Sequence, residues 1–144
     1  MIKNRLRKFG FLLCSIILGS QAMTAEGIGW EPVKLRSIPY PRMLQLARVS
    51  GLVKLQISLS DNGTVEAVKA TSGHPLLANA ASKAVETWLF RRTCQSGDLG
   101  NNQLEMEWRF VLEGSCRGNN CKQTFEVLLP ATVTVTSEIP GLEE

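Results

Sequence analysis

The sequence predicts an α+β domain in which two helices pack on a three-stranded antiparallel sheet that a C-terminal β-hairpin extends. Three observations lead to this fold class. Apolar residues alternate over 52–59 and 103–112, an Asp-Asn-Gly turn follows the first of these strands, and an apolar stripe at helical spacing runs over 76–90. About 120 residues follow the N-terminal segment, which suits one domain with one hydrophobic core.

The first 25 residues have the pattern of an export signal. Four basic residues precede an apolar run over 9–18, and small residues near Ala22 and Ala25 offer cleavage sites. The alternative is an uncleaved membrane anchor, but a spanning helix needs about 20 mostly apolar residues, and the second half of the uncharged run 9–25 is hardly apolar. We expect a cleaved signal and a protein exported from the cytoplasm. A membrane anchor with the domain on the far side of the membrane is the alternative.

Charge gives no sign of a nucleic-acid partner. The chain has 16 basic and 13 acidic residues, and four of the basic residues lie in the signal, which leaves 12 basic residues against 13 acidic ones. A nucleic-acid surface would gather basic residues on one face. We therefore expect no nucleic-acid partner, and membrane contact only if the N-terminal segment stays uncleaved.

The lead-in, 26–39, carries prolines that allow at most a short edge strand, at 30–34. Pro41 suits the first turn of a helix, whose apolar residues include Met43, Leu44 and Ala47, and Gly51 is expected to cap its end. A hairpin of strands 52–59 and 65–70 then follows, before the helix at 76–90, in which we expect Trp88 to pack in the core.

The third strand, 103–112, has one apolar and one polar face. Because the hairpin is antiparallel and the helix runs back along the sheet, the predicted strand order is second–first–third, with the third strand at an edge. An edge strand presents unpaired backbone groups to which another strand can be added. The candidate partner-binding positions on this strand are Gln103, Glu105, Glu107 and Arg109.

The segment 113–137 extends the sheet, with a fourth strand at 123–129 and a fifth at 132–136, and 138–144 is a tail. We expect the fourth strand to pair with the open side of the third. Cys116 and Cys121 flank a turn-rich stretch, so they are the candidate disulfide, although Cys94 with either of them is an alternative. A zinc site using His74 and a redox-active cysteine pair are rival hypotheses, but the cysteine spacing matches no zinc motif and no C-x-x-C is present.

The sequence offers little for catalysis. His74 is the single histidine and lies in a Gly-His-Pro turn, and no serine lies in a G-x-S-x-G motif. Glu105 and Glu107, two positions apart, share one strand face that we expect to be solvated. We therefore expect a protein that is not an enzyme and that uses no cofactor and no metal.

Several motifs in order resemble the TonB C-terminal domain family across residues 40–112. They are Tyr40-Pro41, Ala47, Gly51-Leu52-Val53, Asp61-Asn62-Gly63-Thr64-Val65, Ser72-Gly73, Ala80-Ala81, Trp88-Leu89-Phe90 and Trp108-Arg109-Phe110. The resemblance implies a periplasmic domain of two helices on a three-stranded antiparallel sheet. In energy-transducing members this domain binds outer-membrane transporters by adding a short receptor peptide to the sheet edge.

The chain departs from those transducers near its N-terminus. Their anchor contains a histidine, which residues 1–25 lack, and only about 15 residues, roughly 50 Å when extended, separate the signal from the domain. The leading hypothesis is a periplasmic interaction domain whose partner is an envelope protein or peptide, for instance an outer-membrane transporter. A short anchored energy transducer working with an ion-driven motor complex is the alternative, and a thiol- or metal-binding periplasmic protein is the second.

Overall fold

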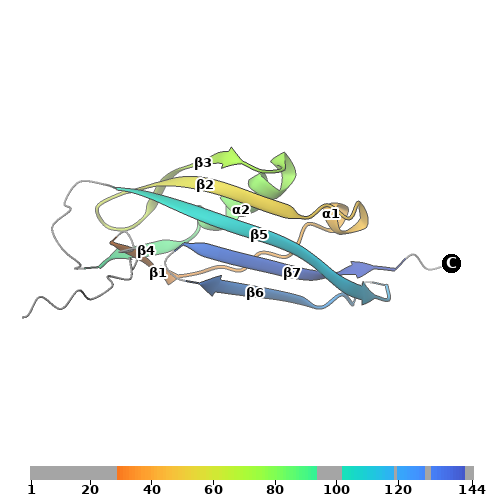
Figure 1. Cartoon of the computed structure of the whole chain (residues 1–144). Coiled ribbons are helices and arrows are strands. Elements are labelled where there is room, and N and C mark those ends of the chain that lie inside the picture. Colours follow the sequence, from red (N-terminus) through yellow and green to blue (C-terminus); the bar gives the residue numbers. More distant parts are fainter. Residues whose placement is uncertain (1–28, 94–101, 119, 129–130, 142–144) are drawn as a thin grey trace, which may run out of the picture.

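The computed structural model describes residues 29–93, 102–118, 120–128 and 131–141. The predicted export signal and Cys94 lie outside these residues. The elements are, in chain order (Figure 1), β1 (Trp30–Lys34), α1 (Arg42–Leu46), β2 (Gly51–Leu59), β3 (Val65–Ser72), α2 (Pro75–Val85), β4 (Leu89–Arg92), β5 (Gln103–Cys116), β6 (Gln123–Leu128) and β7 (Thr132–Pro140).

The main sheet has five strands in the order β3-β2-β5-β7-β6. The predicted hairpin is β2–β3, and β5 pairs antiparallel with β2 on the other side, so the predicted order of the first three strands is confirmed. With the C-terminal strands the sheet has five strands, compared with the three-stranded antiparallel sheet expected for the domain itself. The sheet is also mixed, because β7 runs parallel to β5 while β6 runs antiparallel to β7.

The expectation that the fourth strand pairs with the third is wrong. β7 lies between β5 and β6, and β6 pairs with β7 (Figure 1). Burial explains why β7 and not β6 lies beside β5, since Val133, Val135 and Ser137 on β7 are buried, whereas no residue of β6 is fully buried. The strand with the continuous inward-facing row therefore takes the inner place, and the more polar strand takes the edge. β7 also extends to Pro140, into the stretch expected to be tail.

The second helix is shorter than predicted. α2 ends at Val85, and the residues after Trp88 form β4, which pairs with β1 in a separate two-stranded sheet. At the helix end, the Thr87 hydroxyl donates a hydrogen bond to the Ala84 carbonyl. Tertiary pairing with β1 thus overrides the helical periodicity of these residues. β1 is the short strand expected at 30–34, although it pairs outside the main sheet.

The first helix is also short, and Gly51 does not cap it. α1 has Pro41 at its N-cap and ends at Leu46. Arg48 then takes the left-handed conformation, with φ 53°, that reverses the chain, and Gly51 already belongs to β2. The chain therefore reverses at Arg48, three residues before Gly51, the predicted cap.

The core has two halves of different composition. Over β3 and β2, α2 lays a row of small and aliphatic residues, namely Leu77, Ala78, Ala81, Ala84 and Val85. On the side of β5, β7 and β6, aromatic rings fill the core: Tyr40, Trp88, Trp108, Phe110 and the half-buried Phe125. We call these the alanine half and the aromatic half. Trp88, predicted to be a core residue, is 2% exposed.

The hairpin turn depends on Gly63. Its φ is 86°, a conformation that other residues rarely adopt, and a Cβ there would lie 1.8 Å from the Phe90 carbonyl oxygen. The Phe90 N–H donates to the Gly63 carbonyl at 2.9 Å. The glycine therefore lets the β2–β3 turn and β4 pack directly against each other.

Candidate functional site

The four predicted partner-binding residues lie on β5 with their backbone groups directed away from β2. The Leu59 N–H donates to the Asn102 carbonyl, and in a regular antiparallel ladder every second residue after Asn102 also faces β2, which leaves the positions between them facing outward. Glu107 and Arg109 face β7 and pair with Thr132 and Thr134. The predicted edge is therefore occupied over this part of β5.

Only the beginning of β5 keeps an open side. Gln103 and Glu105 are exposed, and among the described residues their strand has β2 as its single neighbour there. The pairing with β7 starts at Glu107, whose N–H donates to the Ala131 carbonyl at 2.8 Å. The structure thus divides the predicted site into a short open part and a longer part covered by the chain itself.

Contacts beyond the strand ladder fix the C-terminal strands to the rest of the domain. The Gln45 side-chain amide on α1 donates a hydrogen bond to the Ser137 hydroxyl on β7, and both side chains are buried. The Tyr40 N–H donates to the side-chain oxygen of Gln123 at 3.0 Å. Phe125 on β6 completes the aromatic half, with its ring centroid 6.0 Å from that of Trp108. β6 and β7 are therefore part of the core.

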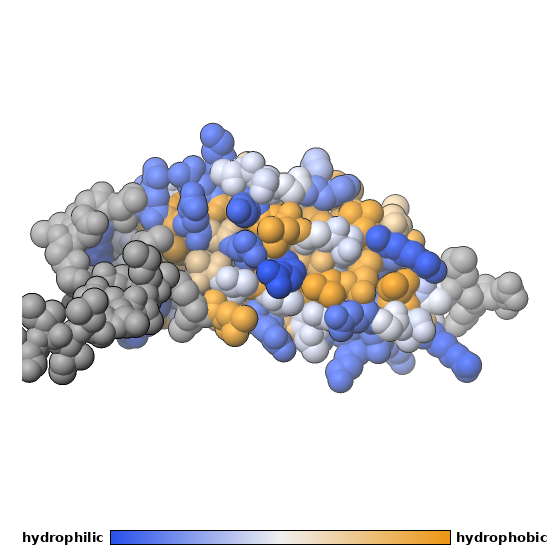
Figure 2. All heavy atoms as spheres, viewed as in Figure 1, coloured by the Kyte–Doolittle hydropathy of each residue, from blue (hydrophilic) through white to orange (hydrophobic). Residues whose placement is uncertain are grey.

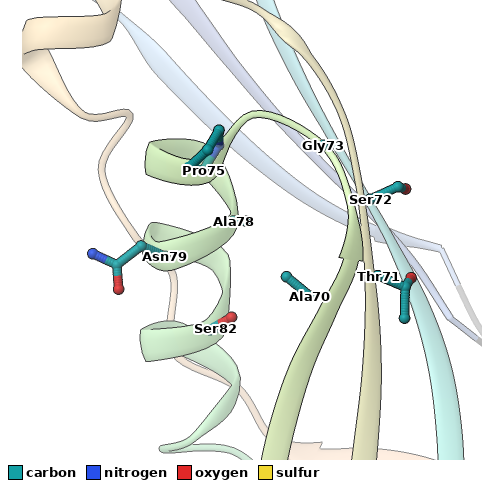
Figure 3. A pocket seen from close by; sticks show the side chains of 8 residues that line it. All are labelled: Ala70, Thr71, Ser72, Gly73, Pro75, Ala78, Asn79 and Ser82. Atoms are coloured by element: carbon teal, nitrogen blue, oxygen red, sulfur yellow. The ribbon is translucent and has the colours of Figure 1, made fainter.

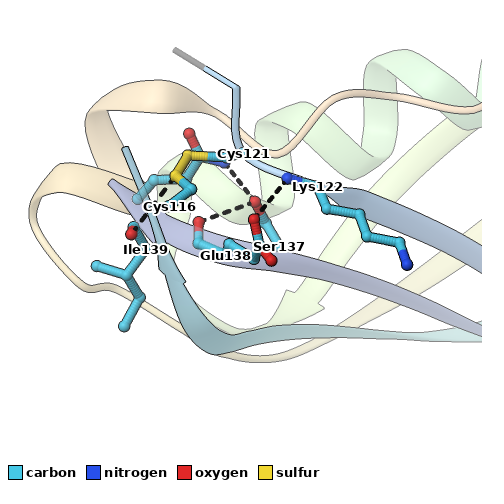
Figure 4. Close-up of a disulfide and its surroundings, with 7 residues drawn as sticks. Cys116, Cys121, Lys122, Ser137, Glu138 and Ile139 are labelled. Atoms are coloured by element: carbon cyan, nitrogen blue, oxygen red, sulfur yellow. Dashed lines mark hydrogen bonds between the residues drawn. A yellow bond between two sulfur atoms is a disulfide. The ribbon is translucent and has the colours of Figure 1, made fainter. Parts of the chain in front are cut away.

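The structure joins Cys116 and Cys121 in a disulfide, the pairing that their spacing favoured (Figure 4). The bond links the end of β5 to the start of β6, while Glu138 of β7 accepts a hydrogen bond from the Lys122 N–H at 2.8 Å. All three C-terminal strands are thereby held together at one end of the sheet. Because the two sulfur atoms bond each other, neither serves as a free thiol or a metal ligand in this structure.

Two other edges of the sheet stay unpaired among the described residues, along β3 and along β6. The β3 edge carries Glu66 and Lys69, and its register with β2 shifts twice, near each end of the strand. The β6 edge carries one charged residue, Glu126, and its six pairs with β7 follow one another without a shift. Charges and bulges are the devices by which proteins discourage unwanted strand addition.

A shallow groove of about 440 Å³ runs between the end of β3 and α2 (Figure 3). Its lining consists of small side chains, namely Ala70, Thr71, Ser72, Gly73, Pro75, Ala78, Asn79 and Ser82. Ala70 points toward the helix, whereas Asn79 points away from the strand. No charged side chain lines the groove, so it lacks the convergent polar groups that fix a ligand in a typical small-molecule site.

The solvent-facing side of the sheet carries both polar and apolar residues. Figure 2 shows hydrophilic and hydrophobic residues interspersed on the molecule viewed as in Figure 1. On β5 the Arg109 guanidinium lies 3.3 Å from the Glu107 carboxylate, and both side chains are partly exposed. Such exposed pairs contribute little to stability.

One titratable group of the described residues is clearly perturbed. Burial raises the pKa of Tyr40 to about 12, because the phenolate would lose its water shell inside the aromatic half. The hydroxyl donates a hydrogen bond to the Val49 carbonyl and so fixes the lead-in to the chain between α1 and β2. This is a structural role.

The described part of the chain has neither a metal-binding cluster nor a membrane-spanning helix. No group of three or more His, Cys, Asp or Glu side chains is placed there to hold a metal ion. His74 acts as the N-cap of α2 and accepts a hydrogen bond from the Leu76 N–H at 3.3 Å. None of the helices described is long and apolar enough to cross a membrane.

The hydrogen bond that connects α1 to β7 was not predicted from the sequence. Gln45 is a polar residue at 3% exposure, and its bond to Ser137 spans 92 positions of the chain. No local pattern reveals such a partner. The inner place of β7 did have a signal, because Val133 and Val135 alternate with threonines, whereas Phe125 and Val127 on β6 alternate with Thr124, Glu126 and Leu128.

A family model and a solved structure are similar to this chain. The model of the Gram-negative bacterial TonB protein C-terminal family matches residues 36–112. A solution NMR structure of the Pseudomonas aeruginosa TonB C-terminal domain matches with 20% identity, 55% coverage of this chain, 80% coverage of that one and a TM-score of 0.40. No curated protein matches significantly. Because the family model spans more than half of the chain, the protein belongs to the TonB C-terminal domain family.

Proposed function

We propose that this chain is a periplasmic protein-interaction domain of the TonB type that binds an extended segment of an envelope protein at an edge of its sheet. The observation that carries the proposal is the family match over residues 36–112. Members of this family are protein-interaction domains of the periplasm that contact partners such as outer-membrane transporters, and the family is not one of enzymes.

The architecture supports this mode of binding. Unpaired strand edges offer backbone donors and acceptors to an added strand, and within the described part of the chain the two outer strands of the main sheet have such edges. The disulfide and the buried Gln45–Ser137 bond hold the sheet in one shape. A rigid edge lowers the ordering cost on the protein's side when a partner strand binds.

The partner that we propose is an outer-membrane transporter. The domain is placed on the periplasmic side of the envelope by the export signal expected at residues 1–25. Two further expectations from the sequence follow the same reasoning: the protein performs no catalysis, and its recognition chemistry comes from backbone hydrogen bonds and alternating side-chain contacts.

Site-specific photo-cross-linking in living cells tests the proposal. A photoreactive residue replaces Thr124 on β6 or Thr71 on β3, and exposed Lys83 on α2 is the control. We expect discrete adducts from at least one strand position, containing an outer-membrane transporter identified by mass spectrometry, and none from Lys83. Absence of any envelope protein in the adducts of both strand positions would contradict the proposed function.

A further inference from the structure

We infer that β6 is the strand to which the partner segment is added, so that the acceptor edge has moved outward by two strands from β5. This inference rests on the proposed function. Over Glu107–Cys116, the far side of β5 is paired with β7 of the same chain. The outermost strand on that side of the sheet is β6, which lies beyond the residues that the family model matches.

The backbone of β6 presents its free groups at alternate residues. The Glu138 N–H donates to the Lys122 carbonyl at 3.1 Å, and the register continues unshifted through the six pairs that follow. In such a ladder the backbone groups of Lys122, Thr124 and Glu126 face β7. Those of Gln123, Phe125 and Val127 therefore face outward, where an added strand would hydrogen-bond to them.

The side chains of β6 define what kind of strand fits. Phe125 and Val127 stand opposite the buried Val135 and Val133, so they lie on the core side and are themselves only partly covered. A neighbouring strand with apolar residues on that side would bury their remaining surface. On the wet side Glu126 is the strand's single charge. The matching segment is extended, apolar at alternate positions, and basic at the position across from Glu126.

The β3 edge is a poorer acceptor for the same segment. Its two register shifts bend the strand, and Lys69 and Glu66 place charges of both signs along it. The side facing the helix carries Ala70 and Val68 in place of an aromatic ring. The contrast between the two edges favours β6.

A defined peptide tests the inference on the full chain. The probe is a blocked seven-residue peptide in which valine alternates with threonine, with lysine replacing the central threonine. We expect saturable NMR shifts at the amides of Gln123, Phe125 and Val127. Replacing Glu126 by lysine should weaken binding of this peptide and strengthen binding of the version with central glutamate.

Backbone methylation supplies the matched control without altering the protein. Methylating the amide nitrogens that face β6 should lower the affinity at least about tenfold, because those N–H donors are lost, whereas methylating the alternate set should not. As a check on the protein side, Val127→Pro removes an outward N–H and should weaken binding by a similar factor. Val127→Thr keeps this N–H and loses only apolar contact, so it should weaken binding less than Val127→Pro does.

Other outcomes overturn the inference. Peptide-induced shifts along Val65–Ser72, or at Gln103 and Glu105, would assign the acceptor edge elsewhere. Shifts at β6 that depend on protein concentration without peptide would show that a second copy of the chain occupies the edge. Absence of any shift would also reject β6, while transporter adducts from Thr71 in the cross-linking experiment would leave the proposed function intact.

Discussion

The alanine half and the aromatic half of the core solve the same packing problem with different side chains. Under α2, Ala78, Ala81 and Ala84 let the helix lie close to β2 and β3. Under β5, β7 and β6 the described part of the chain places no long helix, and the lead-in, α1 and a cluster of rings cover the sheet instead. Small residues let a helix backbone lie close to the sheet, whereas large rings fill the space where no helix backbone lies close.

The largest expected effect comes from the central ring of the aromatic half. Trp108 is fully buried and contacts Trp88, Phe110 and Phe125. Trp108→Ala should lower the free energy of unfolding by about 4 kcal/mol, measured by urea denaturation, because a large cavity replaces the indole.

Trp108→Phe is the control for this substitution. The Trp108 Nε1–H has no hydrogen-bond partner among the described residues, so phenylalanine removes an unsatisfied donor as well as some buried area. Its loss of stability should be much smaller than that of the alanine variant. Equal losses would mean that the ring is not the main filler of this half.

A second substitution tests how close the helix lies in the alanine half. Ala81→Leu forces a larger side chain into a fully buried position and should cost about 2 kcal/mol. Ala80→Leu, one position along the same helix and partly exposed, should cost far less. If both variants unfold at the same urea concentration, the close approach of α2 to the sheet is not what the alanines provide.

Removing the disulfide tests what holds the C-terminal strands of the aromatic half in place. The double variant Cys116→Ser with Cys121→Ser should lose about 2 kcal/mol, since the bond closes a short loop. Hydrogen exchange should accelerate at the amides of β6 and leave those of β2 and β3 protected. An unchanged unfolding midpoint would show that Gln45, Ser137 and the ring contacts alone hold the C-terminal strands.

The smallest effect is a dependence on alkaline pH. The pKa of Tyr40 rises from 10.0 to about 12 on folding, so the neutral phenol favours the folded state. This contribution is complete below pH 10 and is lost as the pH rises toward 12, because the unfolded chain releases the proton first. Tyr40→Phe should unfold with a weaker pH dependence in this window. Parallel curves for both proteins would exclude the tyrosine as the cause.

The same two halves explain what the sequence predicts well and what it does not. Strands β2 and β3 and the start of α2 follow from alternation, the Asn62-Gly63 turn and the stripe that includes Leu77 and Ala81, all of which are local signals. In the aromatic half the arrangement depends on contacts between distant segments. Leu89–Arg92 continue a helical pattern, yet pairing with β1 makes them a strand.

The candidate site shows the same limit. The strand that carries Glu107 and Arg109 was predicted from its alternation, and its edge position from the antiparallel hairpin and the returning helix. The fourth strand was then expected beside it, because neighbours in sequence usually pair in space. β7 breaks that rule by passing β6 and pairing in parallel with β5. A clue to the inner strand is that residues 132–136 form an uncharged run of β-branched residues, whereas the charged Glu126 lies within β6.

The place of β7 also imposes an order of assembly on this side of the sheet. The inner strand is made after the outer one, so β6 has no neighbour to pair with until residues 132–140 are available. A chain that stopped at Leu128 would lack β7 and would leave β6 without its partner strand. The sheet would therefore lose two strands, and Trp108 would be uncovered. During synthesis this half completes last, and the Cys116–Cys121 loop can form while the strand between β5 and β6 is still missing.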